Sequence, residues 1–439
     1  MGFWQVTDSP EIHSNGFHIK FDITEGKLGF ILPTLIPPLC NLELFSRDLA
    51  IGDKNLDCPV WNTCIVLPFK CSLVEGTGMG SWVPKFEDFH PSILLFLHRL
   101  RCIKVRDTMT NSLMIMRRKD IGNGLVKVLH GKESTTWLVA SQKLDVGTMR
   151  PGIQSTKIAM AFTLRQESGG EFVPYLEQQP VFAFLPLRTY GLKFILQGDF
   201  ILPSSREEVD GDSAWNQWLL SEFPELFVNA AESFRSLHCY QRNPGKAVSL
   251  YMSFVPLIGE VLGFFSPLPR MIISKLRVSP CLPLDGMDKR WVLPCMVLRG
   301  WNDQIRILLP DDLLNRHLGV GYLHRDVSLS DPLAAALGVR TFGPRILIDL
   351  MITVCNTGDD LKNLGLNWIG SWLVALYECL SCRPTGHESF FHVNSESDCL
   401  ILLKFHLFHF PMDHILQLEK ILFGYHVRPI DLGLMVCIF

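Results

Sequence analysis

Short apolar runs separated by glycine, proline and asparagine clusters fill the first half of the chain, and this spacing constrains the fold more than any other feature. Runs of this length bounded by turn residues are typical of β-strands. We expect strands within residues 16–23, 27–38, 62–70, 181–187 and 192–202. Two longer stretches, 124–144 and 156–176, are predicted to form hairpins that turn at Gly131-Lys132 and Gly169-Gly170.

Helical patterns appear between and after these strands. Residues 91–107 begin with Pro91, a residue suited to the first turn of a helix, and we expect a helix through Leu100 followed by a strand. Residues 213–237 predict a longer helix, with Ser213 as its N-cap and a kink or break at Pro224. Short helical and strand-like pieces alternate beyond residue 240. The fold class predicted is therefore α/β (α+β).

The length of 439 residues favours two to four domains. Changes in pattern along the chain divide it into four predicted regions: 1–150, 151–270, 271–397 and a divergent tail at 398–439. The tail is rich in histidine and phenylalanine, and its apolar residues follow neither the helical nor the strand period. We expect it to be non-native sequence, from a shifted reading frame or a retained intron, and to pack poorly.

Charge and hydropathy restrict the partners. The formal net charge is −3, so the composition offers no electrostatic case for binding nucleic acid. The 13 cysteines and the absence of a secretory signal pattern favour a reduced intracellular compartment. Residues 247–265 approach the length of a membrane span, but they contain Pro256 and Glu260. We expect this segment in a buried core and predict no membrane association.

Three short motifs suggest chemistry without completing it. "HRDVSLSD" (324–331) begins like a protein-kinase catalytic loop, but Asp331 stands where that loop has asparagine, so a solvated turn is favoured. "GTGMGSW" (76–82) lacks the lysine and serine or threonine of a phosphate-binding loop. "CLSC" (379–382) with His387 supplies too few ligands for a structural zinc site, and no metal site is predicted.

A series of longer segments resembles one family. "VTDSPEIHSNGFHIKFDITEGKLGFILPTLIPP", "WNTCIVLPF", "HPSILLFLHRLRCIKVR" and "FILQGDFILPSSREEVDGDSAWNQWLLSEFPELFV" occur in order, and further matches continue to about Ser381. These segments resemble the plant NO VEIN proteins, which are similar to the sacsin and heat-shock-chaperone branch of the GHKL ATPases. The resemblance implies the C-terminal part of a Bergerat-type ATPase sandwich, followed by a chaperone-middle-domain-like α/β region.

The same resemblance implies ATP and magnesium as cofactors. In the superfamily a Glu/Asn helix supplies the general base and a magnesium ligand, and an Asp-x-Gly-x-Gly box contacts adenine; we find neither in this sequence. Gly2 and Phe3 match the end of the lid loop that covers the phosphates, and Thr63 matches a sheet threonine that contacts adenine. Thr63 is equally well explained as a β-branched strand residue. We therefore expect an N-terminally truncated relative that binds no nucleotide by itself.

The segment "PSSREEV" carries the remaining site residues. It matches the Ser-Arg-Glu loop of the chaperone middle domain at Ser205, Arg206 and Glu207. In that family the arginine reaches the γ-phosphate of ATP when the domains close, so the resemblance implies a phosphate-sensing role for Arg206 and a cofactor-binding role for Ser205. An arginine suits this role because its planar fork binds phosphate oxygens bidentately. A surface ion pair between Arg206 and Glu208 or Asp210 remains the alternative.

The expected function is that of a NO VEIN-like, ATPase-related fragment without independent ATP hydrolysis. The resemblance implies a nuclear protein of plant development; without it, the cytoplasm would be expected. Two alternatives stay open: a non-enzymatic scaffold for protein partners in a nuclear complex, and a genuine ATPase whose N-terminal half is missing from the gene model. The protein partners are not identified by the sequence.

Overall fold

The computed structural model describes residues 7–14, 16–25, 29, 31–39, 63–70, 90–97, 99–107, 112–205, 208–286, 290–357 and 359–381. Helices and β-sheets are mixed along these residues, which confirms the predicted α/β class at that level. The chain divides into two compact units. Unit 1 comprises Met1–Val139, Thr163–Arg165 and Phe182–Pro186, and unit 2 comprises Ala140–Phe162, Gln166–Val181 and Leu187–Phe439. The four regions predicted from the sequence stay a prediction, and the tail at 398–439 lies outside the described residues.

Unit 1 begins with a four-stranded antiparallel sheet of order β3-β2-β1-β4. Its strands are β1 (Glu11–Ser14), β2 (Phe17–Lys20), β3 (Thr34–Leu35) and β4 (Thr63–Val66). A short 3₁₀ helix, η2 (Ile23–Glu25), follows β2. Three of these strands lie inside the apolar runs from which strands were predicted, at 16–23, 27–38 and 62–70.

The second part of unit 1 is an antiparallel meander in which consecutive strands pair. It contains β5 (Cys102–Asp107), β6 (Ser112–Gly122), β7 (Leu125–His130) and the first half of β8 (Glu133–Asp145). The hairpin predicted at Gly131-Lys132 is confirmed, since His130 pairs with Glu133 across that turn. Gly131 has φ +60°, a conformation that favours glycine.

The predicted helix from Pro91 to Leu100 is much shorter than expected. Only a 3₁₀ turn, η6 (Pro91–Leu94), forms, with proline in its first turn as predicted. The Arg118 guanidinium donates to the carbonyl oxygens of Leu94 and Leu95 at 3.1 and 2.6 Å. These are the oxygens that a longer helix would use for its own backbone, so a side chain distant in sequence replaces the helical hydrogen bonds.

Unit 2 contains the rest of β8, strand β9 (Ser155–Gln166) except for Thr163–Arg165, and strands β10 (Phe172–Pro174) and β13 (Ile195–Gln197). β13 and β10 both pair with β9. The hairpin predicted at Gly169-Gly170 is confirmed, because β9 and β10 flank that turn and Gly170 has φ +82°. Residues 181–187, predicted as one strand, form parts of two, β11 (Pro180–Ala183) and β12 (Leu185–Thr189), which are separated at Phe184 with φ +62°. Of these residues, Phe182–Pro186 belong to unit 1.

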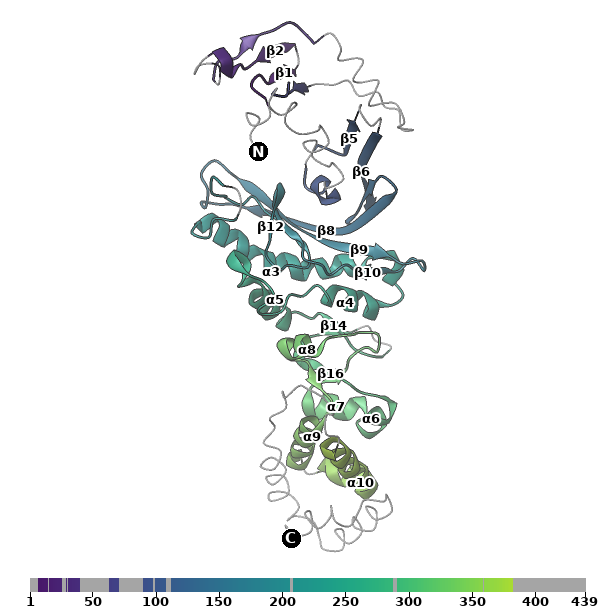
Figure 1. The fold of residues 1–439 in the computed structure, drawn as a ribbon. Coiled ribbons are helices and arrows are strands. Elements are labelled where there is room, and N and C mark those ends of the chain that lie inside the picture. The colour runs from purple at the N-terminus through teal and green to yellow at the C-terminus, as the bar shows by residue number, and fades with distance from the viewer. Residues whose placement is uncertain are drawn as a thin grey trace. The chain divides into compact units, whose positions relative to one another are not determined.

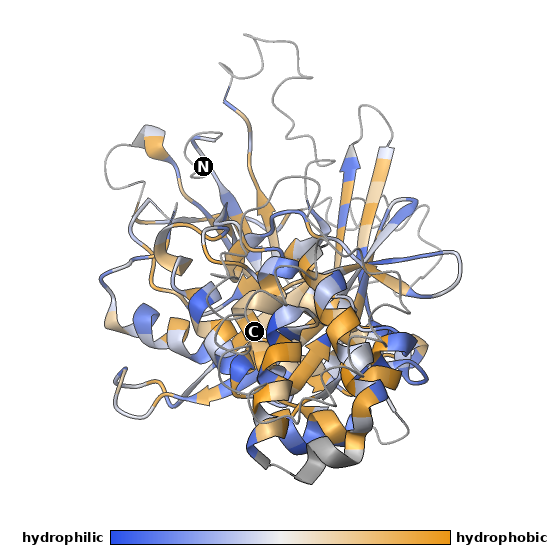
Figure 2. Ribbon diagram, turned by 90° about the horizontal axis from the view of Figure 1, so that it is seen from below, coloured by the Kyte–Doolittle hydropathy of each residue, from blue (hydrophilic) through white to orange (hydrophobic). Residues whose placement is uncertain are grey.

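Three helices complete the layer behind this sheet: α3 (Ala214–Arg235), α4 (Pro244–Met252) and α5 (Leu268–Arg277). α4 and α5 pack against α3, which lies against the strands (Figure 1). Ser213 caps α3 as predicted by accepting the Asn216 backbone N–H at 3.4 Å, and the helix continues through Pro224 without a break. Figure 2 shows helices of the chain that carry both hydrophobic and hydrophilic residues, as expected of helices that bury one face.

Phe162 on β9 is the centre of the core of unit 2. Its fully buried ring lies 5.0 to 5.9 Å, centroid to centroid, from four other phenylalanine rings. These neighbours come from the residue before β13, from α3 and from the turn after α4: Phe194, Phe227, Phe234 and Phe254. Aromatic pairs at such separations add to the free energy that burial of their area already contributes. The cluster therefore packs the helices of unit 2 against its sheet.

The segment 247–265 is buried in unit 2 over most of its length, as expected, but Ile258 and Leu262 in its turn are 74% and 66% exposed. It forms most of α4, a turn, and the 3₁₀ helix η8 (Gly263–Phe265). Glu260 in the turn accepts from Lys193 Nζ at 2.9 Å. None of the helices among the described residues is both long enough and apolar enough to cross a membrane.

The C-terminal part of unit 2 is a small α/β arrangement around three parallel strands. A hairpin of β14 (Leu282–Pro283) and β15 (Trp291–Val292) precedes them. The parallel strands are β16 (Val297–Arg299), β17 (Gly321–Tyr322) and β18 (Arg340–Thr341), with β16 in the centre. The helices between and after them are α6 (Asp303–Leu308), α7 (Asp311–Leu318), α8 (Asp331–Leu337), α9 (Pro344–Thr357) and α10 (Asp359–Ser381).

We expect Phe162→Ala to lower the free energy of unfolding by about 3–5 kcal/mol, because it removes a buried ring from the centre of a packed cluster. Urea denaturation followed by tryptophan fluorescence measures the change. Ile258→Ala is the control, since that side chain is 74% exposed, and it should change stability by less than about 0.5 kcal/mol. Equal effects of the two substitutions would contradict the central role of Phe162.

Candidate functional site

The residues predicted to act at a nucleotide site fall in different parts of the chain. Arg206 lies outside the described residues, as do Gly2, Phe3 and Glu207. Thr63 is the first residue of β4 in unit 1; its exposed side chain shares a 2.7 Å hydrogen bond with the Ser14 hydroxyl. Ser205 is an exposed turn residue of unit 2. The structure therefore describes the base of the Ser-Arg-Glu loop, and not the arginine itself.

Asn216 joins the two chain segments that lead into and out of this loop. Its side chain is fully buried near the start of α3. The amide nitrogen donates to the carbonyl oxygens of Ile201 and Asp210, both at 2.8 Å, and the amide oxygen accepts the Ile201 N–H at 2.9 Å. The backbone N–H of Asp210 also donates to Ile201, at 3.2 Å. A buried side-chain amide thus closes the loop at its base.

Neighbouring side chains at the start of α3 extend this anchor. The indole N–H of Trp215 donates to the carbonyl oxygen of Asp199 at 2.7 Å, and Gln217 donates to that of Gly211 at 2.9 Å. The strand predicted over 192–202 is therefore wrong in its extent, since β13 ends at Gln197. Beyond that residue, side chains of α3 take the backbone hydrogen bonds that a neighbouring strand would otherwise make.

A cavity of about 500 Å³ lies beside the anchored loop. Tyr190 forms part of its wall, and the Tyr190 hydroxyl oxygen accepts the Val209 N–H at 3.1 Å. Burial raises the pKa of Tyr190, so the phenol stays neutral. Arg188 at the rim lies 3.6 Å from Glu208, and both side chains are more than half exposed. Glu208 therefore has a cation other than Arg206 within ion-pair distance.

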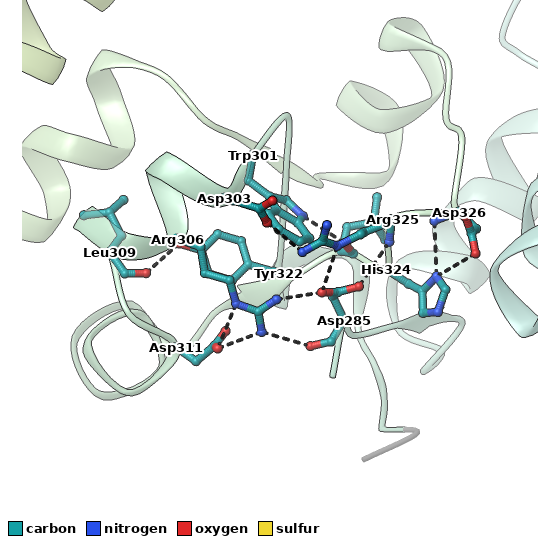
Figure 3. Close-up of polar contacts among 11 residues, drawn as sticks. Asp285, Trp301, Asp303, Arg306, Leu309, Asp311, Tyr322, His324, Arg325 and Asp326 are labelled. Atoms are coloured by element: carbon teal, nitrogen blue, oxygen red, sulfur yellow. Dashed lines mark hydrogen bonds and ion pairs between the residues drawn. The ribbon is translucent and has the colours of Figure 1, made fainter. Parts of the chain in front are cut away.

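The kinase-like motif at 324–326 forms a turn, as predicted, but the turn is docked rather than simply solvated (Figure 3). Asp326 accepts from the Asn243 side chain at 2.8 Å, and its carbonyl oxygen accepts from the Ser249 hydroxyl at 2.9 Å. His324 packs against Gly245, where an added Cβ would come within 2.6 Å of the ring. These contacts attach the turn to α4, and they give His324 and Asp326 a structural role.

Arg325 and Arg306 enclose a tryptophan in the same region (Figure 3). Their guanidinium carbons lie 4.9 and 5.2 Å from the Trp301 ring centroid. Arg306 also donates to Asp285 at 2.6 Å and to Asp311 at 2.7 Å. Side-chain hydrogen bonds with these carboxylates raise the pKa of Arg306. The arrangement joins segments that are distant in the sequence and was not predicted, although "VLRGWND" shows a strand, a glycine turn and a helix cap.

Within the described ranges, no cluster of three or more histidine, cysteine, aspartate or glutamate side chains is placed to hold a metal ion. The structure describes only part of the "CLSC" motif, for which the sequence predicted no metal site. Cys379 lies on α10, whereas Cys382 and His387 lie outside the described residues. The glycine-rich stretch 76–82 also lies outside them.

We expect Asn216→Ala to release the base of the loop. The Ile201 N–H would lose its partner in a buried place, at a cost of about 1–3 kcal/mol in unfolding free energy. Hydrogen exchange read by mass spectrometry should speed up at residues 199–212, the segment that the side chain holds. Gln217→Ala is the matched control, because this neighbouring side chain makes one bond at the surface. Equal exchange in both variants would show that Asn216 does not hold the loop.

The chain is similar to Protein NO VEIN of Arabidopsis thaliana, with 52% identity over 384 residues. The match covers 88% of this chain and 14% of that protein, so the chain spans a small part of the length of the curated relative it matches. No family model matches the chain, and no solved structure matches it. Over most of its length the sequence is therefore NO VEIN-like.

Proposed function

We propose that this chain is a NO VEIN-like segment related to the GHKL ATPases. The segment would comprise the C-terminal part of a Bergerat-type ATPase domain and a chaperone-middle-domain-like region. The observation that carries the proposal is the 52% identity to Protein NO VEIN over 384 residues. On the resemblance described from the sequence, the segment acts in plant development and in the nucleus. The mixed sheet and helix layers of unit 2 are compatible with a middle-domain-like region.

In this proposal Arg206 contacts the γ-phosphate of an ATP bound by a complete ATPase domain. Ser205 precedes it in the same loop, and Gly2, Phe3 and Thr63 would belong to the nucleotide side of the site. The anchored base supports this role, because Asn216 and Trp215 hold both ends of the loop from one helix. A loop fixed at its base loses less conformational entropy when its arginine binds phosphate.

The chain alone is proposed to lack ATP hydrolysis. Hydrolysis in this superfamily needs a general base that activates water and a ligand that holds magnesium. We recognise neither the Glu/Asn helix nor the Asp-x-Gly-x-Gly box in the sequence. An arginine that stabilises charge on a phosphate can raise the rate of a complete site, but it cannot replace those groups.

A non-enzymatic scaffold is the second candidate. It is favoured by the apolar residues exposed on the turn after α4, where Ile258 and Leu262 are 74% and 66% exposed. Leu262 also lines the cavity beside the Ser-Arg-Glu loop. Apolar side chains at such positions are frequent in protein interfaces. In this second candidate function, the loop and the turn bind a protein partner and not a nucleotide.

Titration of the purified chain with Mg-ATP in a calorimeter tests the absence of an independent site. We expect a dissociation constant weaker than about 1 mM, which corresponds to about −4 kcal/mol of binding free energy. Phosphate release should match that of a protein-free blank. A micromolar affinity that persists in the Arg325→Gln variant, or turnover above the blank, would overturn this part of the proposal.

The role of Arg206 is tested in the complete NO VEIN-like protein that contains this segment. Arg206→Ala should lower kcat for ATP hydrolysis by about 100-fold or more, because it removes a charge aimed at the transition state. Arg188→Ala is the matched control, since Arg188 is an exposed arginine beside the base of the same loop, and it should leave kcat nearly unchanged. Similar losses in both variants, or none in either, would contradict phosphate sensing by Arg206.

A further inference from the structure

The three parallel strands at the C-terminal part of unit 2 have the order β17-β16-β18. The chain passes from β16 through α6 and α7 to β17 on one side, and then through α8 to β18 on the other side of β16. The connections therefore reverse direction at the central strand. In open parallel sheets, ligands bind outside the carboxyl ends of the strands at such a reversal.

A cavity of about 310 Å³ lies at these carboxyl ends. Its volume falls at the lower end of the range for small-molecule sites. Residues that directly follow β16 and β17 form most of its wall: Arg299, Gly300, Trp301, Leu323, His324 and Arg325. Gly300 has φ +75°, so the chain turns away from β16 in a conformation that favours glycine. The cavity thus sits where the topology predicts a ligand.

Some charges around the cavity are fixed in the fold. Arg306 is shared between Asp285 and Asp311, and only 14% of the Asp285 side chain is exposed. Asp285 also accepts the Arg325 backbone N–H at 3.4 Å. Asp326 is held by Asn243 on the side of α4. None of Asp285, Asp311 and Asp326 lines the cavity, so these carboxylates stabilise its wall rather than occupy it.

The charged side chains that line the cavity, in contrast, form ion pairs with strongly exposed carboxylates. Arg325 donates to Asp303 at 2.7 Å, and these two side chains are 57% and 74% exposed. Arg299 is bonded to Thr341 and the Leu329 carbonyl oxygen, and its ion-pair partner Asp331 is 87% exposed. Ion pairs between exposed side chains contribute little net free energy. Arg325 also lies 3.6 Å from the mostly buried Asp285, and the Arg299 side chain is only 17% exposed, so the groups that a ligand can displace are the exposed carboxylates of Asp303 and Asp331.

His324 also lines the cavity, and its Nδ1 accepts the Asp326 backbone N–H at 3.2 Å. Asp303 is the one carboxylate among the residues that line the cavity, against two arginines. Because arginine outnumbers carboxylate in the lining, the cavity suits an anion better than a metal cation.

We propose that this cavity binds a small phosphate-bearing molecule, whose phosphate oxygens replace Asp303 at Arg325 and Asp331 at Arg299. The planar guanidinium fork of Arg325 matches phosphate oxygens bidentately, and Arg299 would add a bond from Nη2, the nitrogen that now donates to Asp331. Leu323 and Val327 line the same cavity and would contact a short apolar part of the ligand. The site is independent of Arg206 and of the ATPase relationship.

Calorimetric titration of the full chain with inorganic phosphate tests the site. We expect saturable binding with a dissociation constant of about 1 mM or tighter. Arg325→Gln should weaken it about tenfold or more, because a charge-assisted bond is lost. Asp303→Asn should tighten it by about two- to fivefold, because the competing carboxylate is removed. Arg270→Gln, an exposed arginine on α5, is the control and should leave the affinity unchanged.

Three outcomes would overturn the proposal: no saturable binding by the unmodified chain, equal weakening by Arg325→Gln and Arg270→Gln, or no tightening by Asp303→Asn. Circular dichroism of each variant separates loss of binding from loss of fold. Acetate is titrated in parallel, and tighter binding of acetate than of phosphate would exclude the phosphate class. Arg206→Ala should leave phosphate binding unchanged, so failure here is distinct from failure of the ATPase-related proposal.

Discussion

Unit 2 depends on the packing of Phe162 against rings from α3, from the turn after α4 and from Phe194, which directly precedes β13. Strand β9 contributes this ring from the middle of the sheet, and α3 contributes Phe227 and Phe234. Aromatic rings bury a large apolar area and keep preferred mutual orientations. Apolar packing therefore fixes the position of α3 against the sheet, and the polar contacts that α3 makes depend on that position.

The loop that holds Ser205 inherits its order from that helix position. Ser213, Trp215 and Asn216 lie at the start of α3, one end of a helix whose middle and far end are held by Phe227 and Phe234. Because the helix is fixed, the side chains at its start can reach back to the residues that follow β13. Buried polar side chains of this kind are stable only when all their partners are in place. The apolar core thus determines how precisely the residues at the base of the loop are positioned.

Features governed by neighbours in sequence could be predicted, and those governed by distant side chains could not. The turns at Gly131-Lys132 and Gly169-Gly170 and the cap at Ser213 follow from local backbone preference, and all three were found. The strand over 192–202 and the helix through Leu100 were overextended. In both cases a distant side chain, Asn216 or Arg118, takes the backbone hydrogen bonds.

The candidate sites show the same limit. The Ser-Arg-Glu loop was located by resemblance, whereas the groups that hold its base could not be deduced from spacing. The cavity at the ends of β16 and β17 brings together residues from two separate segments, 299–303 and 323–327. No ligand role was expected for "HRD", because that motif departs from the kinase pattern. These residues meet because β16 and β17, which are three and two residues long, pair in parallel. Strands this short show no periodicity in the sequence, so their pairing could not be predicted from it.

Exposure separates the charges of this region into two classes with different consequences. The pair of Arg306 and Asp285 is mostly shielded from water, so removing one member would leave a partly buried charge without a partner. The pairs of Arg325 with Asp303 and of Arg299 with Asp331 each have a strongly exposed carboxylate, which water can solvate as soon as it is displaced. The first class holds the strand ends in place, and the second keeps two guanidinium groups oriented and available. A rigid wall with exchangeable counter-charges is what an anion site requires, since the arginines need little reorganisation when the ligand replaces the carboxylates.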